Sequence, residues 1–155
     1  RYLSKIPMEA QKTMKAVQVE DFSKPVRVVE LPIPKIAPNQ VLVKQLYSPI
    51  NPSDTLSAQG KYFATANVPT PFIAGFEASG EVVEVGKELE SKFKPGDKVY
   101  YLTVGSWAEY AAVDGDSVHK LPEGAPIDVA ACSFVNPMTV YCMLLELQAG
   151  GHKSV

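Results

Sequence analysis

Short runs of alternating apolar and polar residues fill most of the chain as far as residue 121, and turn-forming residues separate them. Alternation with a period of two is typical of strands that bury one face. The pattern predicts strands over residues 14–20, 26–31, 40–48, 78–85, 98–102, 105–113 and 117–121. Many short strands with turn signals between them favour a small β barrel or sandwich.

Proline and glycine mark the breaks between these runs. Three prolines within residues 32–38 predict a loop, because proline cannot donate a ladder hydrogen bond. A break over residues 49–54 is followed by a predicted short helix through residue 58 or 59, which ends at Gly60, a residue type common just after a helix. Ser53 and Asp54 both suit the N-cap of that helix, and we expect Asp54 to act as a cap.

The period of the apolar residues changes after residue 125. Apolar residues at helical spacing over 126–148 predict two helices divided at Asn136–Pro137, since proline disfavours helical backbone in the residue before it. Cys132 and Cys142 lie in this stretch, about 15 Å apart if it is helical, which is too far for a disulfide. We expect both to be buried, reduced thiols.

Composition and charge are those of an ordinary folded domain. The 155 residues are 46% hydrophobic and 21% charged, with a net charge of −2. This balance gives no electrostatic reason to expect nucleic acid or an anionic membrane as a partner, and no apolar run approaches the roughly 18 residues that span a bilayer. Residues 1–13 are an N-terminal arm or the remnant of a processed presequence, which favours the mitochondrial matrix over the cytoplasm.

Five segments carry a more specific signal. They are N-P-S-D at 51–54, G-F-E-A-S-G-E-V-V-E-V-G at 75–86, K-P-G-D-K-V at 94–99, G-S-W-A-E-Y at 105–110 and V-N-P-M-T-V-Y at 135–141. In this order they resemble the N-terminal, GroES-like domain of the medium-chain dehydrogenase/reductase superfamily. The resemblance implies a mainly β fold with some α: a GroES-like, partly open β barrel over residues 14–125. Linking helices over 126–155 then lead to a Rossmann domain beyond this sequence.

The resemblance also implies a member without zinc. Catalytic-zinc members carry Cys where this chain has Asn51, and Gly-His-Glu where it has Gly75-Phe76-Glu77. Phenylalanine cannot ligate a metal, and residues 90–110 hold no cysteine cluster. We expect a structural, hydrogen-bonding role for Glu77. The two histidines are expected to be surface groups: His119 and His152.

Zinc-free members of the superfamily include quinone reductases and enoyl-thioester reductases, which use a reduced nicotinamide to reduce a small conjugated substrate. The resemblance therefore implies NADPH as cofactor, bound mainly by a domain outside this chain. The alternative is a non-catalytic structural or accessory subunit that reuses the GroES-like domain, since a fold does not guarantee activity. The resemblance is compatible with a homodimer or a larger assembly.

Individual residues take their expected roles from the same resemblance. Tyr62 matches the active-site tyrosine, as a proton donor or a substrate-orienting group. Three polar residues are expected near the nicotinamide: Asn51, Asn136 and Thr139. Trp107 is expected as a wall of the substrate pocket. Three of them also have a structural interpretation, because Asn51 suits a turn, Trp107 suits packing, and Tyr62 suits an exposed loop.

Overall fold

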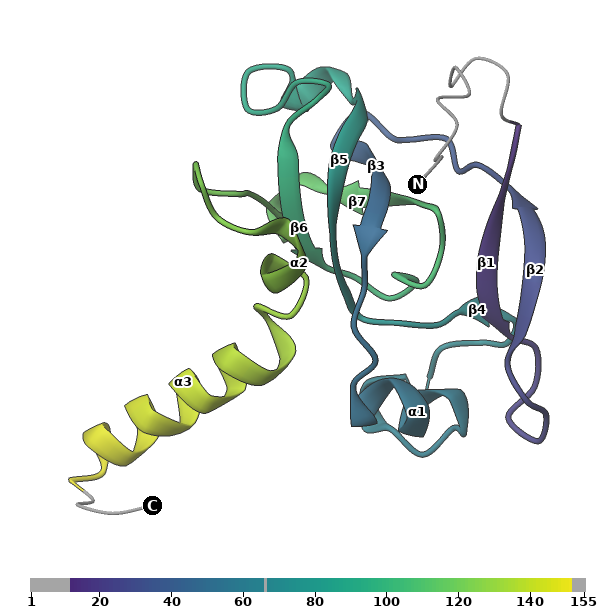
Figure 1. Ribbon diagram of the computed structural model, residues 1–155. Helices are drawn as coiled ribbons and strands as arrows, with labels where there is room; N and C mark the ends of the chain where they lie inside the picture. The colour runs from purple at the N-terminus through teal and green to yellow at the C-terminus, as the bar shows by residue number, and fades with distance from the viewer. Residues whose placement is uncertain (1–11, 66, 152–155) are drawn as a thin grey trace.

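The computed structural model describes residues 12–65 and 67–151 as a chain of short strands followed by helices (Figure 1). The strands are β1 (Thr13–Val19), β2 (Arg27–Pro32), β3 (Gln40–Tyr47), β4 (Phe72–Ile73), β5 (Glu77–Val85), β6 (Lys98–Leu102), β7 (Tyr110–Asp114) and β8 (Val118–Lys120). The helices are α1 (Pro52–Ala58), α2 (Ile127–Ala130) and α3 (Val135–Ala149). Short 3-10 turns occupy η2 (Phe63–Thr65), η3 (Lys87–Leu89) and η4 (Gly115–Ser117).

Two antiparallel sheets form the body. The larger sheet has the order β7-β3-β5-β6-β8, and the smaller has the order β2-β1-β4. A bridge between Ala16 and Ala108 joins the smaller sheet to the segment before β7, and the Val17 N–H donates to the Trp107 carbonyl at 2.8 Å. The larger sheet curls, as the predicted partly open barrel requires, and the mainly β fold class is confirmed (Figure 1).

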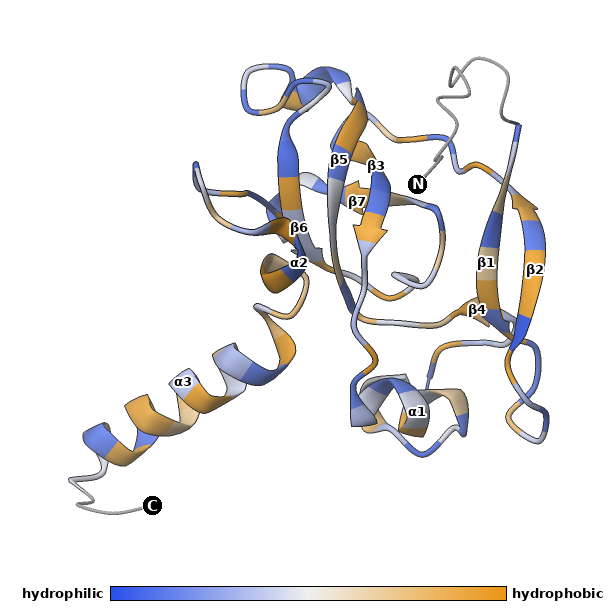
Figure 2. Cartoon of the chain, in the orientation of Figure 1, coloured by the Kyte–Doolittle hydropathy of each residue, from blue (hydrophilic) through white to orange (hydrophobic). Residues whose placement is uncertain are grey.

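The main core lies inside the curl of the larger sheet. Alternate residues of β3 and β5 point into it, so that Val41, Val43 and Val82 are completely buried. Val99 and Tyr101 enter from β6 with the same period of two. Figure 2 shows hydrophobic and hydrophilic residues alternating along these strands. This alternation is the pattern from which the strands were predicted.

One predicted strand is too long. The strand expected over residues 105–113 begins only at Tyr110, because residues 105–109 cross towards β1. Gly105 has φ +103, a conformation that a strand does not use. The other predicted strands are confirmed with ends shifted by a residue or two.

The break between the last two helices lies earlier than expected. Helix α2 ends at Ala130 and α3 begins at Val135, so the interruption falls at residues 131–134. Asn136 and Pro137 lie instead in the first turn of α3. Proline is tolerated there because the first backbone N–H groups of a helix have no intrahelical acceptor.

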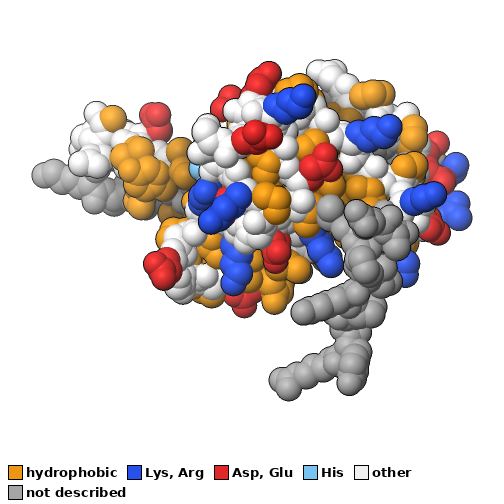
Figure 3. All heavy atoms as spheres, turned by 90° about the horizontal axis from the view of Figure 1, so that it is seen from above, with side chains coloured by type: hydrophobic (Ala, Val, Ile, Leu, Met, Phe, Trp, Pro, Cys, Tyr) orange, Lys and Arg blue, Asp and Glu red, His pale blue; other side chains and the backbone are white. Residues whose placement is uncertain are grey.

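Helix α3 projects away from the barrel, and none of its residues is buried (Figures 1 and 3). Its apolar side chains lie on successive turns, among them Val140, Tyr141 and Leu144. Cys132 and Cys142 are free, as predicted, but the expectation of burial is wrong: both are exposed, since nothing described packs over them. Within the described ranges, no helix is both long and apolar enough to cross a membrane.

Candidate functional site

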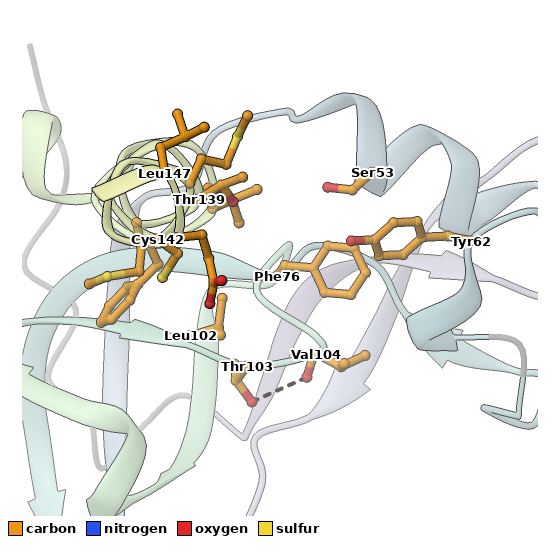
Figure 4. Close-up of a pocket in the computed structure, with 14 residues that line it drawn as sticks. Ser53, Tyr62, Phe76, Leu102, Thr103, Val104, Thr139, Cys142 and Leu147 are labelled. Atoms are coloured by element: carbon orange, nitrogen blue, oxygen red, sulfur yellow. Dashed lines mark hydrogen bonds between the residues drawn. The ribbon is translucent and has the colours of Figure 1, made fainter. Parts of the chain in front are cut away.

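A cleft of about 1090 Å³ separates α3 from the end of the barrel that carries α1 (Figure 4). Ser53, Tyr62 and Phe76 line one side, and Met138, Thr139 and Cys142 of α3 line the other. Most of the lining side chains are apolar. Such a surface favours a ligand with an extended apolar part and a few polar groups.

Tyr62 projects into this cleft from the loop between α1 and η2. The loop starts at Gly60, whose φ of +67 ends the helix as predicted, and the Lys61 N–H donates to the Leu56 carbonyl at 2.9 Å. The ring of Tyr62 packs at 5.6 Å from the ring of Phe76, and its hydroxyl points towards the cleft (Figure 4). No residue in the described ranges hydrogen-bonds this hydroxyl, which leaves it available to a ligand.

Asn51 caps helix α1, and this corrects the expectation that Ser53 or Asp54 would be the N-cap. Pro52 is the first helical residue, and the Asn51 N–H donates to Oδ2 of Asp54 at 2.6 Å, so Asp54 acts from the third helical position. Burial raises the pKa of Asp54, the Asn51 N–H lowers it, and the nearby carboxyl of Glu77 raises it further. This first turn is packed inside the protein, with Asn51 only 4% exposed.

Glu77 connects the barrel to both helices. It is the first residue of β5, it is 1% exposed, and its Oε1 accepts from Asn51 Nδ2 at 2.8 Å. Its Oε2 accepts from the backbone N–H groups of Phe134 and Val135 at 2.9 and 3.0 Å, and so caps α3. The hydrogen-bonding role expected for Glu77 is confirmed. A carboxylate at a helix N-terminus is favourable because it meets unpaired N–H groups.

The structure brings together four of the five residues that were given functional roles. Asn136 Nδ2 donates to Asn51 Oδ1 at 2.9 Å, which links Asn136 through Asn51 to the Glu77 carboxylate. Thr139 lies one turn further along α3, faces the cleft, and hydrogen-bonds the Val135 carbonyl. Tyr62 lies on the opposite wall (Figure 4).

Trp107 is not among the residues that line this cleft. Its indole N–H donates to the Pro49 carbonyl at 3.0 Å, and its ring lines a smaller cavity beside β1 and β3. Trp107 therefore lies where a packing residue would lie. Three cleft residues had no sequence signal: Phe134, Met138 and Cys142 come to the cleft only through the direction that α3 takes.

The positions of the absent zinc ligands are filled by other interactions. Asn51 is held by Glu77 and Asn136, and Phe76 packs against Tyr62. Among residues 12–65 and 67–151, no group of three or more His, Cys, Asp and Glu side chains could hold a metal ion. His119 is exposed and its ring lies 5.3 Å from that of Phe134, whereas His152 lies outside the described residues.

A curled, partly open sheet that carries a short capped helix at one end is consistent with a GroES-like domain. Residues 37–123 match the family model of the alcohol dehydrogenase GroES-like domain, and the chain belongs to this family. The matched region runs from the loop before β3 to the turn after β8.

Curated relatives carry two kinds of name. The chain is 38% identical over 121 residues to "Probable quinone oxidoreductase" of Schizosaccharomyces pombe, and the matched region covers 77% of this chain and 36% of the relative. It is 35% identical over 153 residues to the mitochondrial enoyl-[acyl-carrier-protein] reductase of Caenorhabditis elegans, and the matched region covers 92% of this chain and 43% of the relative. The chain thus spans less than half the length of these relatives.

Solved structures agree with both names. The mitochondrial 2-enoyl thioester reductase Etr1p/Etr2p heterodimer of Candida tropicalis matches with a TM-score of 0.70 and 30% identity, over 86% of this chain and 43% of that one. A complex of Etr1p with NADP and crotonyl-CoA matches with a TM-score of 0.70 and 29% identity, over the same shares. The quinone oxidoreductase of Coxiella burnetii matches with a TM-score of 0.71 and 26% identity, over 85% and 45% of the two chains.

Proposed function

We propose that this chain is the substrate-side part of a zinc-free, NADPH-dependent reductase of enoyl thioesters or quinone-like acceptors. The observation that carries the proposal is the apolar cleft into which Tyr62 points its hydroxyl. The named quinone and enoyl reductases among the relatives support it, and so does the similar structure that holds NADP and crotonyl-CoA. In this proposal, most of the cofactor is bound by a part that corresponds to the length of the relatives not covered by this chain.

The polar residues at the cleft fit the nicotinamide end of such a cofactor. Thr139 lines the cleft and Asn136 lies one turn before it on α3. The Thr139 hydroxyl donates to the Val135 carbonyl and the Asn136 amide donates to Asn51, so each has an acceptor oxygen left for a group such as the carboxamide N–H. Asn51 is buried and already engaged by Glu77 and Asn136, so its role is to orient its neighbours. When bound, the reduced nicotinamide supplies a hydride to the conjugated carbon of the substrate.

Tyr62 is the group that stabilises negative charge on the substrate and supplies a proton to it. Addition of hydride to the β-carbon of an enoyl thioester moves negative charge onto the carbonyl oxygen as an enolate. A hydroxyl at that oxygen stabilises the charge, and a tyrosine within reach of the α-carbon can supply the proton. Phe76 packs against the Tyr62 ring and keeps that side of the cleft apolar, which favours exclusion of water.

We extend the proposal to the location and assembly of the enzyme. The relatives named as mitochondrial enoyl reductases support the mitochondrial matrix, whereas the relative named only as a quinone oxidoreductase gives no such indication. A dimer is supported by the exposed apolar residues of α3 and by the heterodimer among the similar structures.

The test uses the full-length protein that contains this chain. Oxidation of NADPH is followed with crotonyl-CoA and, separately, with a quinone, and the faster substrate identifies the class. Tyr62→Phe removes only the hydroxyl and is expected to lower kcat by about 100-fold, the usual contribution of a general acid. Tyr47→Phe is the matched control, because Tyr47 is exposed on β3 and lies outside the cleft.

Two results would contradict the proposal. An unchanged rate in Tyr62→Phe removes Tyr62 from the mechanism. Failure of the full-length protein to bind NADPH, together with a stable co-purifying protein, favours the non-catalytic subunit instead.

A further inference from the structure

A chain of side-chain hydrogen bonds runs from the buried carboxylate of Glu77 to the surface of α3. Asn51 Nδ2 donates to Glu77 Oε1 at 2.8 Å, and Asn136 Nδ2 donates to Asn51 Oδ1 at 2.9 Å. Glu77 is 1% exposed and Asn51 is 4% exposed, whereas Asn136 is exposed at the outer end. We call this chain of three side chains the amide relay.

The buried end sets the direction of every bond in the relay. An ionised carboxylate can only accept, and Glu77 receives three donors: Asn51 Nδ2 and the backbone N–H groups of Phe134 and Val135. Asn51 must therefore turn its nitrogen towards Glu77 and its oxygen towards Asn136. Asn136 must in turn point its nitrogen inward, because an oxygen there would face another oxygen. This order follows from the chemistry of the groups.

We propose that Glu77 is a positioning residue that fixes the amide of Asn136 with its carbonyl oxygen outward. No residue in the described ranges donates to that oxygen, which lies one turn from Thr139 at the cleft. The site therefore offers an acceptor and selects a ligand group that donates, such as the N–H of the nicotinamide carboxamide or a ribose hydroxyl. The identity of this ligand rests on the proposed function, whereas the direction of the relay does not.

The direction can be reversed by substitution. In Glu77→Gln the side-chain oxygen can still accept from Phe134 and Val135, while the new NH₂ group faces Asn51. Asn51 and Asn136 then both turn over, the hydrogen bonds of the relay are retained, and Asn136 presents N–H groups outward, whereas the Asn51 oxygen turns away from the Asp54 N–H that it meets in the capping box. The substitution removes the favourable charge at the start of α3, so a small loss of stability accompanies it.

Asn136→Asp tests the direction without any ligand, in the full-length protein. With Glu77 in place, the new carboxylate faces the Asn51 oxygen, and Tm is expected to fall by about 3–6 °C, the effect of an unmet buried acceptor. In the Glu77→Gln background Asn51 presents its nitrogen instead, and the same substitution is expected to change Tm by less than about 1 °C. An equal fall in both backgrounds overturns the relay.

Two controls separate the relay from repulsion by exposed charges. Glu81→Gln removes a carboxylate from the same strand, and because Glu81 is exposed and outside the relay it should not rescue Asn136→Asp. About 1 M salt screens repulsion by exposed charges, whereas it leaves a mismatch of hydrogen-bonding groups in place and screens a buried charge such as Glu77 much less. A rescue that disappears in high salt, or that Glu81→Gln reproduces, also overturns the proposal.

Binding of NADPH tests the ligand separately, by fluorescence titration of the same variants. Glu77→Gln is expected to raise Kd for NADPH by about tenfold, the effect of replacing an acceptor by a donor, while Glu81→Gln leaves Kd unchanged. Asn136→Ala should raise Kd to a similar extent, and adding Glu77→Gln to it should have no further effect, because Glu77 acts through Asn136. If Glu77→Gln leaves Kd unchanged, the ligand assignment is wrong. If the wild-type protein does not bind NADPH, the proposed function fails, and the Tm comparison still decides the relay.

Discussion

Gly75 occupies a position that no other residue fits, and its replacement by alanine should destabilise the protein through two separate effects. Its φ is +92, a conformation that L-residues rarely adopt. A Cβ added there would lie 2.3 Å from Ser106 Oγ and 2.4 Å from Trp107 Cδ1. Neither neighbour moves easily, because Ser106 hydrogen-bonds Ser48 at 3.0 Å and Trp107 hydrogen-bonds the Pro49 carbonyl at 3.0 Å.

The expected cost combines both effects. A left-handed backbone costs an alanine about 1–2 kcal/mol relative to glycine, and overpacking of a fixed site costs about 1–3 kcal/mol. Gly75→Ala should therefore lower the free energy of unfolding by about 2–5 kcal/mol. Gly96 is the matched control, because its φ is +90 but an added Cβ would meet nothing within 4 Å. Gly96→Ala should show only the backbone cost, about 1–2 kcal/mol.

Urea denaturation of the full-length protein and the two variants gives the free energies of unfolding. The steric argument requires Gly75→Ala to be less stable than Gly96→Ala. Equal losses would refute it and would show that Ser106 and Trp107 shift at little cost. Because Gly75 directly precedes Phe76 and Glu77, Gly75→Ala should also lower activity, whereas Gly96→Ala should not.

Two further predictions concern buried polar groups. Burial raises the folded-state pKa of Asp54 above its ordinary value of 3.8. As the pH falls from neutral through the raised pKa towards 3.8, the folded state takes up more protons than the unfolded state, so the wild-type protein should gain stability relative to Asp54→Asn. A constant difference between the two proteins in unfolding experiments over that range would contradict the shift. The Tyr101 hydroxyl is buried without a hydrogen-bond partner in the described residues, so Tyr101→Phe should raise the free energy of unfolding by about 1 kcal/mol. A decrease of similar size in the free energy of unfolding would contradict this and would reveal a hydrogen-bond partner.

The local parts of the fold were readable from sequence because each depends on near neighbours. Alternation with a period of two predicted the strands, and Gly60 correctly marked the end of α1. The family resemblance then identified the curled barrel, and it singled out Asn51, Tyr62 and Thr139, which the structure places at or beside one cleft. The functional roles of these residues remain predictions.

Two of the failures depend on how distant segments are placed, whereas the N-cap of α1 and the break before α3 were misplaced by a few residues within local sequence. The strand expected from residue 105 starts at Tyr110, because the preceding residues are drawn to β1. The cysteines were expected to be buried, as free cysteines usually are, but Cys132 is exposed between α2 and α3, and Cys142 is exposed on α3, which extends beyond the described barrel. Trp107 lies at a smaller cavity, with its indole N–H donating to the Pro49 carbonyl, and its role at a substrate pocket stays a prediction.

The sequence by itself determined the strands, the turns, the family and the residue types available for chemistry, because these follow from local backbone preference and from ordered motifs. Only the tertiary structure showed that Glu77 holds α1 and α3 together. Its three hydrogen-bond donors come from residues 26, 57 and 58 positions away, and no local pattern encodes such contacts. A buried carboxylate must be satisfied by whatever donors the fold brings to it, and here those donors set both walls of the cleft.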